Sequence, residues 1–229
     1  MKPMRGSLCD QVFLLSPAYC GGRRAQILRR PGSGSSLAIR LREGTLTLGE
    51  AFAFMSGLYF RGKLAYARTF GRAPAGTAGS TLIITPTRGL QLPEQIVTEA
   101  AVNEFATVDV SASDDRYTRP LERDASALAA ALDADARVVL LGSIATGKYV
   151  DLLASILGPR LHYPSAFVGR GDMSRGGLLL RSAAASTELE YDVLSPGIRP
   201  RGPRPPRLDP RLRVPPSVIR RMNREPTRP

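Results

Sequence analysis

Residues 137–157 read RVVLLGSIATGKYVDLLASIL, and this stretch decides the fold class. The run Arg137–Leu141 is apolar after its first residue, which is typical of a buried strand. A glycine-containing loop, Gly142–Tyr149, follows, and the next residues predict a helix that ends at Leu157, before Gly158-Pro159. A strand, a loop and a helix in this order indicate one unit of an α/β protein.

The same order recurs along the chain. Gln11–Leu15 and Thr81–Thr85 predict two more strands, each followed by a loop that contains glycine. Weaker runs indicate further strands at Val108–Val110, Leu161–Tyr163, Gly177–Arg181 and Glu188–Val193. The recurrence predicts a three-layer α/β fold, with a mostly parallel sheet flanked by helices. In such sheets, ligands bind at the carboxyl ends of the strands.

The strongest helix signal covers Leu48–Phe70. Thr47 and Glu50 fit a capping box at its start, and Gly71 follows its end. Lys63 lies among aromatic residues spaced three or four positions apart. Either its pKa is lowered, which suits a base or a nucleophile, or its amine extends to water. Two other helices are expected, at Arg23–Arg30 and Leu121–Leu132.

Composition divides the chain into a body, residues 1–196, and a tail, residues 197–229. The tail holds ten arginines, two acids and no lysine, so it carries +8 of the net charge of +12. Because proline is frequent there and apolar residues are sparse, we expect a disordered tail. Its arginines suit the phosphates of a nucleic acid or another polyanion. The other interpretation is a solubilising extension.

Composition also argues against several classes of protein. The sequence has no run of about 18 apolar residues, and Val12–Leu15 is too short for a signal peptide, so we expect a cytoplasmic protein that binds no membrane. Two cysteines argue against a disulfide framework. With the single histidine, His162, they make a zinc site unexpected, and no metal site is predicted. The sequence identifies no cofactor.

The loop Gly142–Tyr149 matches the pattern G-x-x-x-x-G-K of phosphate-binding loops. It lies between a strand and a helix, as such loops do, but Tyr149 stands where Ser or Thr would bind magnesium. Two interpretations stay open. The loop binds a nucleotide, or it is a glycine-rich turn that caps the helix and can still bind an anion.

The segment Val168–Gly177 combines four glycines, two arginines, one aspartate and one serine. Such residues bind phosphate or carboxylate groups, although a turn in which Asp172 pairs with an arginine has the same composition. Cys20 is either a thiolate favoured by its basic neighbours or a buried structural thiol. The ligand-binding candidates are Gly21, Arg88, Gly142, Ser143, Lys148, Gly169, Arg170 and Arg175, and the catalytic candidates are Asp172, Asp109 and Cys20.

Several short motifs follow one another within residues 11–181. They are Cys20-Gly21, Leu58-Tyr59-Phe60-Arg61 with Ala65-Tyr66-Ala67, Arg88-Gly89-Leu90 with Pro93, Gly147-Lys148-Tyr149, and Pro164…Gly169…Gly171. Their order resembles that of a loose group of uncharacterised bacterial α/β proteins, and it is distantly similar to the uracil-DNA-glycosylase-like accessory domain of archaeosine synthase. The resemblance implies a three-layer α/β fold and an association with nucleic acid or modified bases. The chain lacks the glycosylases' activating aspartate motif and a well-placed histidine, which argues against cleavage of a glycosidic bond.

These features predict a nucleic-acid- or nucleotide-associated α/β protein with a glycine- and arginine-lined phosphate site. A base- or nucleotide-processing reaction there would use Asp172 or Asp109 as acid or base. The alternative is a non-enzymatic protein that binds polyanions through its basic tail. The expected partner is a nucleic acid or a nucleotide, and the oligomeric state stays open.

Overall fold

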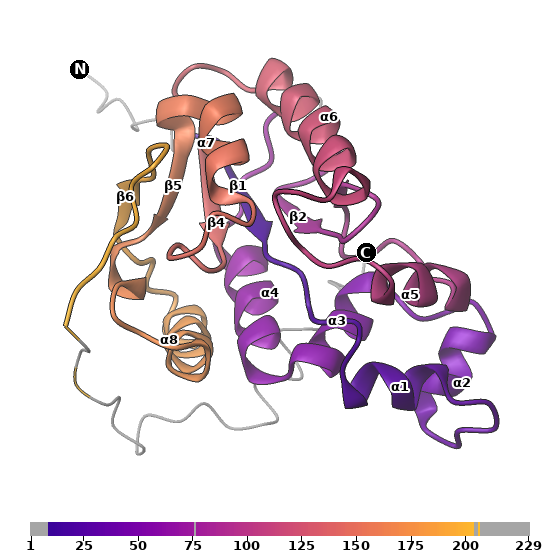
Figure 1. Cartoon of the computed structure of the whole chain (residues 1–229). Coiled ribbons are helices and arrows are strands. Elements are labelled where there is room, and N and C mark those ends of the chain that lie inside the picture. The colour runs from indigo at the N-terminus through magenta and orange to yellow at the C-terminus, as the bar shows by residue number, and fades with distance from the viewer. Residues whose placement is uncertain (1–8, 76, 204–205, 207–229) are drawn as a thin grey trace.

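The structure, a computed structural model, describes residues 9–75, 77–203 and 206. Within them, one six-stranded sheet has the order β3-β2-β1-β4-β5-β6 (Figure 1). The strands are β1 (Gln11–Leu15), β2 (Thr81–Ile84), β3 (Leu90–Gln91), β4 (Arg137–Leu141), β5 (Leu161–Pro164) and β6 (Tyr191–Val193). The four central strands are parallel, and the edge strands β3 and β6 pair antiparallel. The predicted α/β fold with a mostly parallel sheet is confirmed.

Helices flank this sheet and complete the three layers (Figure 1). In the described part of the chain they are α1 (Arg23–Arg29), α2 (Ser36–Arg42), α3 (Leu48–Ser56), α4 (Leu58–Phe70), α5 (Glu99–Ala106), α6 (Asp115–Ala131), α7 (Val150–Leu157) and α8 (Asp172–Ala184). Helix α4 packs on β1 and β2 and against α8, whereas α6 packs against α7, which contacts β5. Helices α1, α2, α3 and α5 gather beside the sheet, and we call this group the helical lobe (Figure 1).

The core is centred on β1 and β4. All five residues of β1 are buried, and in β4 only Arg137 is partly exposed. Phe13 of β1 packs edge-on against Tyr66 of α4, with ring centroids 5.6 Å apart. Because central parallel strands are covered on both faces, their sequences are nearly continuous apolar runs. The loops that leave these two strands therefore start from a rigid base.

The helix predicted over Leu48–Phe70 is two helices. Its start is confirmed, since Thr47 and Glu50 form the capping box. The helix is interrupted at Gly57, whose φ of 65° lies outside the helical region. A glycine adopts this φ without steric cost, so α4 leaves α3 in a new direction. The change of direction at Gly57 allows α4 to pack on β1 and β2.

The strand predicted at Gly177–Arg181 is wrong, because these residues belong to α8. A Cβ added to Gly62 of α4 would lie 2.6 Å from the carbonyl oxygen of Gly176, and one added to Gly176 would lie 2.8 Å from the Cα of Tyr59. The glycines thus let α4 and α8 touch backbone to backbone. Their role is helix packing, which a local pattern of glycines does not reveal.

Other boundaries differ from the predictions. The strand at Val108–Val110 is wrong: Val108 is buried and Asp109 is exposed, but the segment is a loop without a sheet partner in the described chain. The helix predicted at Leu121–Leu132 starts earlier, at Asp115, because α6 continues through Pro120. The strand predicted over Glu188–Val193 is confirmed only as β6.

Most of the predicted tail lies outside the described residues. Of residues 197–229, the structure describes 197–203 and 206, and the expected disorder of the others lies outside the described residues. The side chain of Arg199 pairs with Asp151 at the start of α7. A Cβ on Gly169 would lie 2.2 Å from the carbonyl oxygen of Pro203. The first residues of the tail therefore pack on the body.

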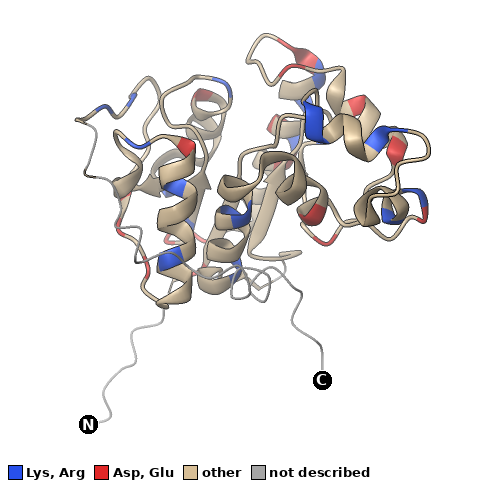
Figure 2. Ribbon diagram, turned by 90° about the horizontal axis from the view of Figure 1, so that it is seen from below, with Lys and Arg blue, Asp and Glu red and all other residues tan. Residues whose placement is uncertain are grey.

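Basic and acidic positions are interspersed over the ribbon (Figure 2). In the described ranges, no helix is long and apolar enough to cross a membrane. The same ranges contain no group of three or more His, Cys, Asp or Glu side chains that could hold a metal ion.

Candidate functional site

The best-placed cavity lies where the strand connections diverge. Strand β1 pairs with β2 on one side and with β4 on the other, and all three are parallel. The chain leaves β1 toward α1 and leaves β4 toward α7. In open α/β sheets, such a switch in strand order leaves a crevice at the carboxyl ends, where ligands bind.

This crevice, which we call the switch cavity, has a volume of about 720 Å³. Volumes of this order suit a ligand of nucleotide size. The residues that line it come from loops and helices far apart in the sequence: Ser16–Gly21, Ser56, Tyr59, Lys63, Pro86, Phe105, Ala106, Val108–Ser111, Ser143, Thr146, Lys148, Tyr149 and Asp172.

Lys63 is the most unusual group of the cavity. Its side chain is 1% exposed. Its amine Nζ donates hydrogen bonds to the carbonyl oxygen of Ser16 at 2.6 Å and to the hydroxyl Oγ of Ser16 at 2.8 Å. The same Nζ lies 4.7 Å from the ring centroids of Tyr59 and Phe60. The lysine therefore does not extend to water, and it joins α4 to the end of β1.

Burial lowers the pKa of Lys63 to about 7, because the charged amine loses its hydration. The carboxylate of Asp172 opposes this shift by stabilising the charged form. An amine with this pKa exchanges a proton at neutral pH, as a general base must. Of the two interpretations that the sequence left open for Lys63, the burial of its amine and its hydrogen bonds to Ser16 favour the first and argue against an amine that extends to water.

Tyr149 extends this polar network from Ser16 into the β4 loop. Its hydroxyl accepts a hydrogen bond from the backbone N–H of Ser143 at 2.7 Å. Burial raises the pKa of Tyr149, and hydrogen bonds with Ser143 and the Ser16 side chain oppose the rise. A Cβ on Gly142 would lie 2.7 Å from the Tyr149 hydroxyl and 2.8 Å from the Cβ of Ser16. Gly142 is thus needed for close packing behind the cavity.

Cys20 does not have the properties of a reactive thiolate. It is 3% exposed, and its thiol donates to the carbonyl oxygen of Ala18 at 3.4 Å. Burial raises the pKa of Cys20 to about 12, and Arg29 opposes this only in part. The structure supports the second interpretation, a buried structural thiol.

Six predicted site residues come together at the switch cavity: Cys20, Gly21, Asp109, Ser143, Lys148 and Asp172. Lys148 and Asp109 are exposed at its wall. Asp172 lies in the first turn of α8, with its side chain 70% exposed. Loops from β1 and β4 thus converge, as the position of strand carboxyl ends predicts.

Five other predicted residues do not line the cavity. Arg88 is paired with Glu104 at 2.6 Å. Arg170 donates to the carbonyl of Ala166 and to Ser174. Arg175 is buried and donates to the carbonyl oxygens of Phe167 and Gly142, so it braces the β4 loop. The two glycines of this set, Gly142 and Gly169, are packing positions.

Sequence reasoning did not select Ser16 or Tyr149 as site residues. Ser16 directly follows the β1 strand and precedes Pro17, which marked only a strand end. Tyr149 counted only as a mismatch to the phosphate-loop pattern. Ser16 could have been selected because it directly follows a central parallel strand, where ligands bind in such sheets. No local signal reports its contact with Lys63, which is 47 residues away.

No known protein family, curated protein or solved structure matches this chain. The resemblance to the archaeosine synthase accessory domain therefore stays a prediction, and the switch cavity must be interpreted from its own chemistry.

Proposed function

We propose that the protein is an enzyme that processes a nucleotide-sized substrate in the switch cavity. The observation that carries the proposal is the buried amine of Lys63, hydrogen-bonded to the Ser16 hydroxyl at the carboxyl end of β1. Burying a lysine amine costs free energy, and an apolar side chain would fill the same space in the core without that cost. Buried ionisable groups of this kind cluster at functional sites.

Lys63 and Ser16 have the geometry of a base and a nucleophile. When neutral, Lys63 accepts the proton of the Ser16 hydroxyl across their 2.8 Å contact, and the Ser16 oxygen attacks an electrophilic centre of the substrate. The protonated amine then donates to the leaving group. The Asp172 carboxylate stabilises this charged amine. In the second half of the reaction the neutral amine takes a proton from water, and the water oxygen bonds to the same centre as its bond to the Ser16 oxygen breaks. The amine then returns this proton to the Ser16 oxygen, so the net reaction is a hydrolysis.

The substrate class follows from size and charge. The switch cavity has room for a nucleotide, and Lys148 places an exposed cation at its wall. Tyr19 is 75% exposed beside it and offers a ring for a base to stack on. The alternative function, polyanion binding through the arginine-rich tail, depends mostly on residues outside the described part of the chain and stays a prediction.

The test uses the full-length protein with a panel of nucleotides, nucleosides and nucleobases. Ligands that raise the melting temperature identify the substrate class, and their turnover is then measured. We expect S16A and K63M to lower kcat by about 10²-fold or more, the usual contribution of a general base, while S16A still binds the ligand.

The matched control is C20A, on the same loop, which should keep turnover because its buried thiol takes no part. Turnover that survives in S16A and K63M, or is lost in C20A, would contradict the assignment of Ser16 and Lys63. If no member of the panel stabilises the wild-type protein, the nucleotide class is wrong.

A further inference from the structure

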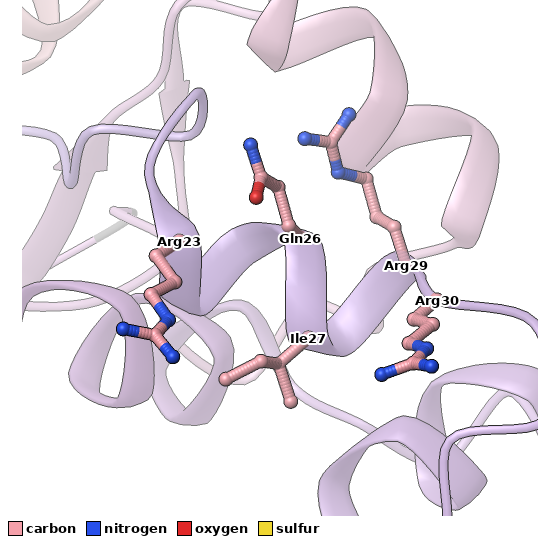
Figure 3. A pocket seen from close by; sticks show the side chains of 5 residues that line it. All are labelled: Arg23, Gln26, Ile27, Arg29 and Arg30. Atoms are coloured by element: carbon pink, nitrogen blue, oxygen red, sulfur yellow. The ribbon is translucent and has the colours of Figure 1, made fainter.

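A second cavity, of about 620 Å³, lies against α1 and is formed by Arg23, Gln26, Ile27, Arg29 and Arg30 (Figure 3). We call it the α1 pocket. Arg23, Ile27 and Arg30 extend from one side of the helix and Gln26 and Arg29 from the other (Figure 3). Spacings of three and four residues place side chains on one helix face. Arg23 and Arg30 therefore place two guanidinium groups on the same side of the helix, with Ile27 between them.

Arg23 and Arg30 have no use within the described protein. Both side chains are exposed, and neither makes a hydrogen bond or an ion pair with any described residue. Arg29 is held in place, since it donates to Asn103 of α5 at 3.3 Å and to the carbonyl of Ala25. Arg29 is thus engaged within the protein, whereas the donors of Arg23 and Arg30 can bind an anion.

The chain segment that carries the α1 pocket is basic. Residues 11–42 contain six arginines and no acid, and of these Arg40 is paired with Glu50 of α3. Ile27 is 39% exposed between Arg23 and Arg30. A polymer with regularly spaced charges can contact Arg23 and Arg30 together, and their planar guanidinium forks fit phosphate groups in particular.

The α1 pocket adjoins the switch cavity through the turn Tyr19–Gly22. Tyr19 and Gly21 line the cavity, and Arg23 directly follows Gly22. The ring of Tyr19 lies over this turn: a Cβ on Gly21 would meet the Tyr19 hydroxyl at 2.7 Å. The turn thus presents an aromatic ring, 75% exposed, between the cavity and the arginines. Basic grooves next to exposed aromatic rings are typical of proteins that bind single-stranded nucleic acid.

We propose that the α1 pocket binds the phosphodiester backbone of a single-stranded nucleic acid, with a base stacked on Tyr19, so that the adjoining nucleotide enters the switch cavity. This inference rests on the proposed function, because it makes the nucleotide in the cavity part of a strand. An acidic peptide would satisfy the arginines but leave the Tyr19 ring without a planar partner.

The experiment measures binding of the full-length protein to single-stranded DNA and RNA of about twelve nucleotides, within the usual site size, by fluorescence anisotropy at several salt concentrations. R23E/R30E should weaken binding at least ten-fold. The slope of log K against log salt is negative, and each lost phosphate contact reduces its magnitude by about 0.7, so the loss of two contacts should make it less negative by about 1.4. The control R119E/R123E reverses two exposed arginines of α6 and should change little.

Y19A separates stacking from charge. It should weaken binding about ten-fold, the size of one base–aromatic contact, without changing the salt slope. Equal losses in R23E/R30E and R119E/R123E, or no loss in either, would overturn the α1 site and assign the affinity to general charge or to the tail. A polyglutamate peptide that binds as tightly as the oligonucleotides, with the same loss in R23E/R30E, would also overturn it.

The proposed function and the α1 site fail in different experiments. The proposed function is wrong if no mononucleotide, nucleoside or base stabilises the protein, whereas the α1 site is tested only by comparing how the variants bind the oligonucleotides. A mononucleotide that stabilises the protein, combined with unchanged strand binding in R23E/R30E, removes the α1 site and leaves the switch cavity as a site for a free nucleotide.

Discussion

The loop after β1 and the loop after β4 look alike in outline, since both leave a central parallel strand, contain glycine and line the switch cavity. They differ in what their polar groups already bind. In the β4 loop, which matches a phosphate-binding pattern, the N–H of Ser143 is taken by the Tyr149 hydroxyl, and Asp151 in the first turn of α7 is paired with Arg199. In the β1 loop, which matches no pattern, Ser16 contacts a buried amine.

A match to a motif reports the shape of a loop, whereas acid–base chemistry depends on groups that can exchange a proton. In the β4 loop the N–H of Ser143 already has an acceptor, so we interpret this loop as a wall of the cavity. The β1 loop carries a hydroxyl next to the amine of Lys63, whose pKa burial lowers to about 7.

The cost of burying Lys63 should depend on pH. In the unfolded chain the amine has its ordinary pKa of 10.5, and in the folded chain about 7. Between these values the unfolded state binds more protons, so stability rises with pH, and below about pH 7 the full penalty is present. Relative to K63M, the wild type should therefore gain about 1 kcal/mol per pH unit from pH 7 to 10. Urea unfolding at several pH values measures this.

The matched control is Lys148→Met, which removes an exposed lysine from the β4 loop. Because this side chain is exposed, the substitution should change the free energy of unfolding little. If the free energies of unfolding of the wild type and K63M change with pH in parallel, the amine of Lys63 does not exchange a proton in this range. Ser16 would then have only a structural role.

The central strands could be predicted because a strand that is buried on both faces is a continuous apolar run in the sequence. Val12–Leu15 and Val138–Leu141 are continuous apolar runs, and the Thr47–Glu50 capping box lies within four residues. The edge strand β3 has two residues and no such trace. The break at Gly57 was missed because the flanking residues keep a helical pattern on both sides.

The site was predicted in outline and missed in its chemistry. Cys20, Ser143 and Lys148 follow parallel strands, whose carboxyl ends lie at one edge of the sheet, and this was enough to predict that they line one cavity. The contact between Ser16 and Lys63 depends on how α4 packs across β1, which no local pattern contains. The glycines and arginine of Val168–Gly177 suggested a ligand site, but tertiary contacts use Gly176 and Arg175 inside the protein.

Gly142 is where the two loops touch, so its substitution should disturb both. In G142A the new methyl group would lie 2.7 Å from the Tyr149 hydroxyl and 2.8 Å from the Cβ of Ser16. Overpacking of this kind costs about 2 kcal/mol, and it should also displace Ser16 from Lys63 and lower turnover. The control G34A places a methyl group in open space. Equal free energies of unfolding for G142A and G34A would mean that the loops do not pack as described.

The smallest effect concerns the hydroxyl that closes the β4 loop. Y149F leaves the N–H of Ser143 without its acceptor, which should cost about 1 kcal/mol in free energy of unfolding. Y117F is the matched control, since the buried Tyr117 hydroxyl has no hydrogen-bond partner among the described residues, and its removal should be neutral or slightly stabilising. If Y149F also gains affinity for inorganic phosphate, the freed amide has become a ligand. The β4 loop would then be a phosphate-binding loop closed by its own tyrosine, whereas unchanged phosphate affinity would confine it to a structural wall.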